Sequence, residues 1–267
     1  ATLPRTRRYL PHRHFKTSLM PVRILLLAAC LLLPSLSGAA EVSVAVAANF
    51  AAPMHKIAQA FERATGHRAI VALGSTGRFH AQIRQGAPFQ LLLAADDRTP
   101  RLLEQEGLAI AGSRFTYAVG RLVLWSATPG RVDAQGEVLR RGGVERLAIA
   151  DPRLAPYGAA AVEVMQRLGV LQAWQPRLVQ GESVGQAFQF VATGNAALGF
   201  VALSQLRALP AATPGSAWLV PAELHRPLRQ DAVILRPGQG QPAALALASF
   251  LQGDEARAIL RAYGYAF

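Results

Sequence analysis

Residues 44–50 constrain the fold of this chain more than any other stretch. They form an apolar run of strand-like composition that stops at a small polar residue, Asn49, and an amphipathic pattern follows directly. Four apolar residues then fall at the i, i+3, i+4, i+7 spacing of one helical face: Met54, Ile57, Ala58 and Phe61. Asn49 is therefore predicted to cap a helix that follows a strand. Such a place gathers unpaired backbone N–H groups and the positive end of a helix dipole, which favours an anion.

Strand-like and helix-like stretches alternate along the rest of the chain, which predicts α/β architecture with largely parallel sheets. We expect two lobes of similar size: residues 41–120 in lobe 1, 121–229 in lobe 2, and 230–267 returning to lobe 1. Residues 117–125 are predicted to form one long strand. A chain that crosses twice between lobes leaves a cleft and a hinge, and ligands of open α/β sheets bind beyond the carboxyl ends of the strands.

Residues 1–40 are predicted to be an upstream segment and a secretory signal peptide. Arg23 precedes a short apolar core at 24–33, and small residues lead to a cleavage point after Ala40. The core is too short to span a bilayer as a stable helix, so the mature chain is predicted to be periplasmic. Cys30 follows a sequence like a lipoprotein acylation box, but three leucines come after it, which disfavours a lipid anchor there.

Charge and cysteine content exclude several classes of protein. The 267-residue chain has a net charge of +12, but six basic and no acidic residues lie in 1–40, and their removal halves the excess to +6. The remaining arginines are scattered, so no nucleic-acid partner is predicted. Cys30 is the only cysteine. The exported chain is therefore predicted to have no disulfide and no cysteine metal site, and no cofactor is expected.

Four strand-to-helix turns combine small or hydroxyl residues with free backbone N–H groups. They are residues 48–50 and 74–77 in lobe 1, and 156–158 and 183–185 in lobe 2. Together they are predicted to surround an anion from both sides with uncharged donors. Arg78 is the basic residue next to one of them. Ordinary capping explains each turn taken alone, so the hypothesis depends on the four together.

Several motifs resemble the periplasmic molybdate-binding proteins of ABC importers. The similar segments run in order along nearly the whole mature chain, at 46–50, 74–77, 85–88, 93–96, 150–152, 155–158 and 197–201. The resemblance implies a two-lobe periplasmic-binding-protein fold of type II, with a ligand cleft between the lobes and no enzymatic activity. It also implies an oxyanion site at Asn49, Ser75, Thr76, Tyr157 and Val184. Asn49 and Thr76 would give side-chain and backbone donors, and Tyr157 and Val184 backbone N–H groups.

The same resemblance implies molybdate as ligand, with tungstate as a second one, and an ABC permease in the inner membrane as partner of a monomeric protein. Molybdenum would be held only as the oxyanion. Sulfate or phosphate stays open as an alternative, because the sequence does not give the size of the cavity. Phosphate receptors usually need a carboxylate as proton acceptor, and Glu182 directly precedes the last turn. A secreted hydrolase with His80 as base is less favoured, because the chain lacks the Gly-x-Ser-x-Gly and His-Glu-x-x-His motifs.

Overall fold

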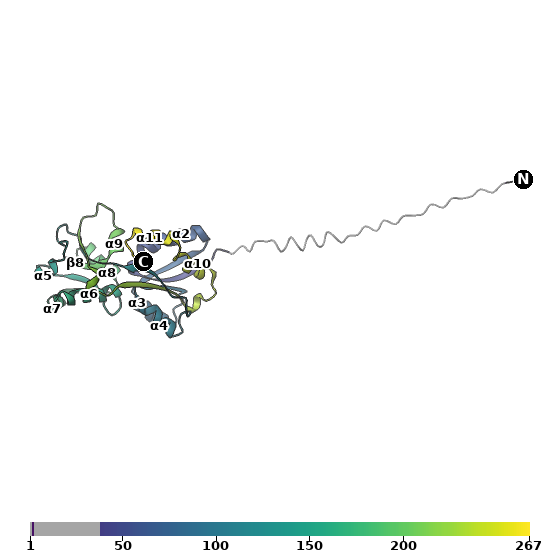
Figure 1. Ribbon diagram of the computed structural model, residues 1–267, viewed down its shortest axis with the longest axis horizontal. Helices are drawn as coiled ribbons and strands as arrows, with labels where there is room; N and C mark the ends of the chain where they lie inside the picture. Colours follow the sequence, from purple (N-terminus) through teal and green to yellow (C-terminus); the bar gives the residue numbers. More distant parts are fainter. Residues whose placement is uncertain (1, 3–37) are drawn as a thin grey trace. The chain divides into compact units, whose positions relative to one another are not determined.

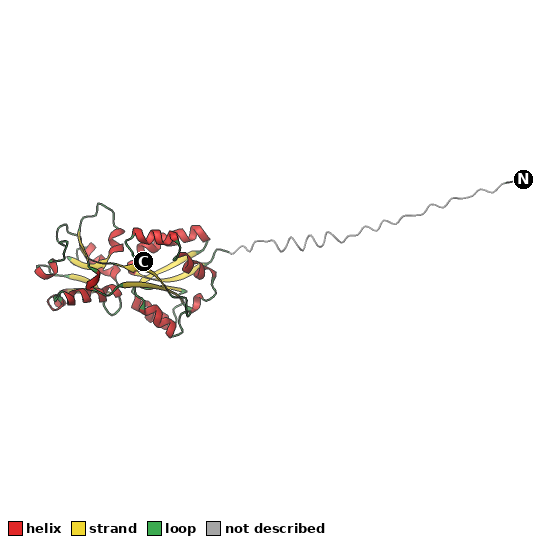
Figure 2. Ribbon diagram, in the orientation of Figure 1, coloured by secondary structure: helices red, strands yellow, loops and turns green. Residues whose placement is uncertain are grey.

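Two five-stranded sheets, flanked by helices, make up the folded part of the chain (Figure 1, Figure 2). The structure, a computed structural model, describes Thr2 and residues 38–267, and residues 39–267 form one compact unit. The predicted signal peptide, with Cys30, lies outside the described residues except for 38–40. Within 38–267, no helix is both long and apolar enough to cross a membrane.

The first sheet has the strand order β2-β1-β3-β10-β4. Its strands are β1 (Glu41–Ala47), β2 (Arg68–Gly74), β3 (Leu91–Leu93), β4 (Phe115–Gly120) and β10 (Leu228–Ile234). Strands β2, β1 and β3 pair in parallel, and β10 is antiparallel to both of its neighbours. Alternate residues of β1 point to opposite faces, so Val44 and Ala45 belong to different hydrophobic clusters.

Helices cover both faces of this sheet. One cluster joins it to α2 (Ala51–Thr65), α10 (Pro242–Phe250) and α11 (Asp254–Ala262). The other joins it to α3 (Thr76–Arg84) and α4 (Arg98–Gln105). The short helix η1 (Ala48–Phe50) connects β1 to α2, and η4 (Arg236–Gly238) follows β10.

The second sheet repeats the arrangement with the order β7-β6-β8-β5-β9. Its strands are β5 (Leu122–Ser126), β6 (Leu147–Ala150), β7 (Leu178–Gly181), β8 (Leu198–Ala202) and β9 (Ser216–Leu219). Its larger helices are α6 (Pro156–Arg167) and α8 (Val184–Ala192), which pack in different hydrophobic clusters. The shorter helices are α5 (Val138–Arg141), α7 (Leu171–Trp174), η2 (Gln175–Arg177), α9 (Leu203–Arg207) and η3 (Ala222–Leu224). Strand β5 is antiparallel to both of its neighbours, so each sheet contains one reversed strand. The two-lobe α/β class expected from the sequence is confirmed.

The chain passes from the first sheet to the second between Gly120 and Leu122. The prediction of a single strand over 117–125 is therefore wrong, because β4 ends at Gly120 and β5 begins in the other sheet. A Cβ at Gly120 would lie 2.1 Å from the Tyr157 hydroxyl oxygen, so only glycine leaves room at this crossing. The chain returns to the first sheet before Leu228, where β10 begins. The lobe boundaries at 120/121 and 229/230 stay a prediction.

Candidate functional site

The five predicted site residues line one small cavity between the two sheets. Asn49, Ser75 and Thr76 come from the first lobe, and Tyr157 and Val184 from the second. All five are buried. The volume of this cavity is about 10 Å³, which suits one small ligand.

In the first turn of α3, the backbone N–H of Thr76 stays free for the cavity. The N–H of Gly77 donates to the Leu154 carbonyl oxygen at 2.8 Å, and the N–H of Arg78 donates to Ser75 Oγ at 3.4 Å. Within residues 38–267, the Thr76 N–H is left without a partner in this turn. Thr76 Oγ1 accepts from the Ala95 N–H at 2.9 Å, so its own hydrogen is free to donate. Ser75 Oγ is likewise an acceptor with a free hydrogen.

The helices of the second lobe show the same pattern. In α6 the first residue is Pro156, which has no N–H, and Gly158 donates to the Ala155 carbonyl oxygen at 2.9 Å. Of this first turn, the Tyr157 N–H has no partner among the described residues. In α8 the N-cap Ser183 accepts from the Gln186 N–H. The N–H of Val184, the first residue of α8, likewise has no partner among the described residues.

Asn49 corrects one detail of the sequence interpretation. It lies inside η1, whose N-cap is Ala47, and its side chain caps no helix. Its Nδ2 donates to Gln230 Oε1 and to the Tyr265 hydroxyl, both at 2.9 Å. Both amide hydrogens are thus engaged inside the protein, whereas the sequence interpretation expected this side chain to donate to a ligand. Its backbone N–H is the donor that this residue offers to the cavity.

Charged side chains stay out of the cavity. Among the described residues that line it, none carries a formal charge. Arg78, which follows the second turn, forms an ion pair of 2.8 Å with Glu182 of the opposite lobe, and both side chains are more than half exposed. Burial raises the pKa of Tyr157 well above its ordinary value, so this phenol stays neutral as well. The cavity can therefore hold an anion only through neutral donors.

A larger groove lies beside the cavity and shares Ala95, Ala155 and Pro156 with it. Its volume is about 410 Å³, and it is lined by residues of both lobes, His80 included. The His80 Nε2 lies 3.5 Å from a Glu106 carboxylate oxygen. The strand-to-helix turns that offer backbone N–H groups from both lobes line the small cavity, which makes it the better candidate. In the part of the chain that the structure describes, no group of three or more metal-ligating side chains comes together.

Sequence reasoning missed the polar residues behind the cavity. Gln230 is fully buried, and its amide contacts Asn49, Tyr117 and Tyr157. Tyr265, near the C-terminus, donates to the Asn49 carbonyl oxygen at 3.0 Å. The bonded pairs of this network are separated by 73 to 216 positions in the chain, so no local motif marks them. Only the polar residues within the otherwise apolar stretch of β10 give a signal.

Comparison with known proteins gives consistent matches along the described chain. The family described as bacterial extracellular solute-binding protein matches residues 42–266. The chain is 58% identical over 234 residues to the molybdate-binding protein ModA of Azotobacter vinelandii, covering 88% of this chain and 93% of that protein. It is 52% identical over 235 residues to the molybdate-binding protein ModA of Rhodobacter capsulatus, with coverages of 88% and 91%. The solved periplasmic molybdate-binding protein of Azotobacter vinelandii superposes with a TM-score of 0.82 at 43% identity, over 85% of this chain and 99% of that one.

Proposed function

Because this chain belongs to the family of periplasmic molybdate-binding proteins of ABC transporters, we propose that the small cavity between its lobes is where it binds molybdate. It is a binding protein and not an enzyme, and it works outside the cytoplasm. Its partner is the permease of an ABC transporter, to which it delivers the oxyanion. That it acts as a monomer stays a prediction.

The observation that supports this site is the convergence of neutral donors from both lobes. The N–H groups of Asn49, Thr76, Tyr157 and Val184 and the hydroxyls of Ser75 and Thr76 belong to one cavity. A hydrogen bond to a charged group contributes about 1.5–3 kcal/mol, so six such donors supply about 9–18 kcal/mol. Dehydration and ordering offset part of this. Micromolar to nanomolar affinity, about 8–12 kcal/mol, is within this range.

The lining of the cavity favours a fully deprotonated oxyanion. A protonated anion such as hydrogen phosphate needs an acceptor for its proton, and among the described residues no carboxylate lines the cavity. Glu182, the candidate acceptor from the sequence, is paired with Arg78 instead. We therefore propose tungstate as a second ligand, because it shares the charge, shape and size of molybdate, whereas sulfate is a smaller dianion, and we place phosphate last.

A titration of four anions tests this order. Isothermal titration calorimetry and thermal melting of the protein with molybdate, tungstate, sulfate and phosphate should give heat and a raised melting temperature with the first two. Sulfate should bind more weakly, and phosphate should have no effect. Molybdate that neither binds nor stabilises the protein would refute the proposed function, and tight phosphate binding would refute the argument from the cavity lining.

A matched pair of serine variants tests the site residues. Ser75 and Ser183 cap α3 and α8 with the same 3.4 Å hydrogen bond, so each alanine variant loses a similar cap, worth about 0.5–2 kcal/mol of stability. Ser75→Ala should also lose a donor to the anion and weaken molybdate binding by about 1.5–3 kcal/mol, roughly 10- to 150-fold. Ser183→Ala should lower the melting temperature equally but the affinity far less. Ser183 also lines the cavity, so equal losses of affinity in the two variants would contradict the choice of Ser75 as the serine ligand.

A further inference from the structure

Gln230 connects the two halves of the candidate site from behind. Its side chain is fully buried at the start of β10, where the chain has just returned to the first sheet. Its Oε1 accepts from Asn49 Nδ2 at 2.9 Å and from the Tyr117 hydroxyl at 3.0 Å, and its Nε2 donates to the Tyr157 hydroxyl at 3.2 Å. One amide thus holds two site residues that come from different lobes.

The geometry points to a role that depends on the proposed function. We propose that Gln230 is a positioning residue, which fixes the backbone N–H groups of Asn49 and Tyr157 toward each other across the anion cavity. Neither side chain of this pair is needed as a ligand, because each is engaged with Gln230. The side chains act as anchors, and the anion meets the peptide groups that they orient.

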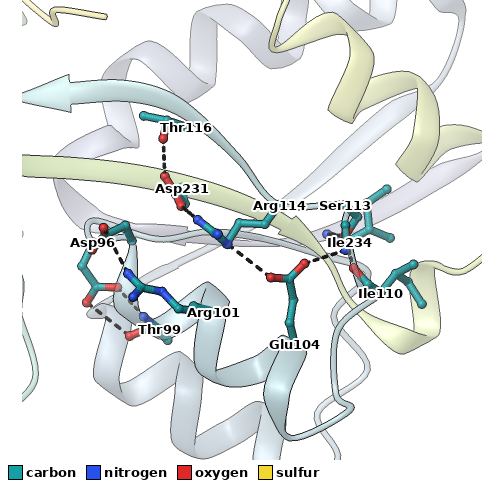
Figure 3. A network of polar contacts seen from close by, with 12 residues as sticks. Asp96, Thr99, Arg101, Glu104, Ile110, Ser113, Arg114, Thr116, Asp231 and Ile234 are labelled. Carbon is teal, nitrogen blue, oxygen red and sulfur yellow. Dashed lines mark hydrogen bonds and ion pairs between the residues drawn. The ribbon is translucent and has the colours of Figure 1, made fainter.

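The surroundings of Gln230 are built to keep its amide in place. A bulge separates Gln230 from Asp231 in the pairing of β10 with β4. The Asp231 carboxylate accepts from Thr116 Oγ1 at 2.7 Å and pairs with Arg114, which reaches on to Glu104 (Figure 3). This network fastens β10 to β4 immediately beside Gln230. The Gln230 side chain is therefore held by its own strand before any ligand binds.

Both crossings between the sheets meet at this point. A Cβ at Gly120, on the first crossing, would lie 2.5 Å from Gln230 Nε2, on the second. The Asn49 peptide is held from its other side too, since its carbonyl oxygen accepts from Ser204 Oγ at 2.7 Å. Ser204 lies in α9 of the second lobe. A change in the angle between the lobes must therefore disturb the contacts that orient the donors, which couples the hinge to the anion.

The test compares two hydroxyl deletions on the same amide. Tyr157→Phe removes the cross-lobe contact of Gln230 but keeps the backbone N–H at 157. Tyr117→Phe removes a contact of similar length that stays within the first lobe, where the single hydroxyl hydrogen of Tyr117 is shared between Gln230 Oε1 and the Ala94 carbonyl oxygen, 2.9 Å away. Molybdate affinity and dissociation rate are measured for each by calorimetry and stopped flow, and the melting temperature is measured without anion. Gln230→Leu is added as the full deletion of the amide.

Tyr157→Phe and Gln230→Leu should weaken molybdate binding by about 10- to 100-fold, the size that supporting partners of a ligand site commonly contribute. The double variant, Tyr157→Phe with Gln230→Leu, should lose no more affinity than the weaker-binding single variant. The reason is that both substitutions remove the same Gln230–Tyr157 hydrogen bond. Tyr117→Phe should change affinity less than about threefold while lowering the melting temperature as much as Tyr157→Phe. Wild-type affinity in Tyr157→Phe, or an equal loss in Tyr117→Phe, overturns the proposal. If the wild-type protein itself fails to bind molybdate, the proposed function fails instead.

Discussion

Replacing Gly77 by alanine should weaken molybdate binding while leaving the anion-free protein at least as stable as before. Gly77 is the second residue of α3, and its N–H donates across the cleft to the Leu154 carbonyl oxygen at 2.8 Å. A Cβ at Gly77 would lie 3.0 Å from both the Cα and the carbonyl oxygen of Leu154, tighter than nearly all real contacts. The alanine methyl group therefore acts as a wedge between the lobes, directly beside Thr76.

The size of the effect follows from two costs that exist only while the lobes are together. Loss of the Gly77–Leu154 hydrogen bond costs about 0.5–1.5 kcal/mol, and overpacking costs about 1–3 kcal/mol. Their sum, about 1.5–4.5 kcal/mol, corresponds to a dissociation constant raised roughly 10- to 2000-fold. When the lobes part, both costs disappear. The alanine then stabilises α3 by up to about 1 kcal/mol relative to glycine.

Calorimetry with molybdate and thermal melting without it separate these two effects. Gly185→Ala is the matched control, because its Cβ would meet Ala48 of the first lobe at 3.3 Å, a milder approach. Its affinity loss should be smaller than that of Gly77→Ala. A Gly77→Ala protein that binds molybdate like the wild type but melts at a lower temperature would refute the reasoning, since the strain would then be inside one lobe.

Two further predictions concern charged groups at the surface. Reversing either partner of the Arg78–Glu182 pair should weaken molybdate binding by up to about fivefold at low salt, as surface pairs contribute about 0.2–1 kcal/mol. The double swap Arg78→Glu with Glu182→Arg should restore it, and a swap that binds no better than the single variants would contradict a cross-cleft pair. A hydrogen bond from the Glu137 N–H, the largest cause, helps to lower the pKa of Asp133 to about 2 from 3.8. The stability that Asp133 contributes is therefore complete above pH 3.8 and lost as the pH falls toward 2. Urea unfolding should show Asp133→Asn less stable than the wild type at about pH 5, with the difference shrinking below about pH 4; a constant difference would argue against it.

The parts of the site that depend on local chain conformation were predictable from the sequence. A short apolar run followed by a small or hydroxyl residue marks the passage from strand to helix, and Ser75 and Ser183 do cap α3 and α8 with their side chains. Helix starts leave N–H groups free by geometry alone. The sequence could therefore predict free backbone N–H groups at Thr76, Tyr157 and Val184 without knowing what their side chains touch.

Side-chain roles were less predictable, because their partners are distant in the chain. Asn49 has the residue type of an N-cap and stands at a helix start, yet its amide bonds to Gln230 and Tyr265, 181 and 216 positions away. Local propensity favours capping only when nothing stronger competes for the amide. A buried network that satisfies both amide hydrogens is such a competitor.

The wrong prediction of a single strand over 117–125 and the failure to predict the role of Gln230 have the same cause. Apart from Gly120, nothing in the local pattern distinguishes a continuous strand from two strands that meet at a sheet crossing, because both are apolar and extended. What separates them is Gly120, where a side chain would collide with the Tyr157 hydroxyl and with Gln230. A glycine inside a strand pattern signals a close approach of other groups, but only the tertiary structure says which groups approach. Here they are the anchors of two predicted anion donors, so the residue that breaks the strand pattern also marks where the hinge meets the site.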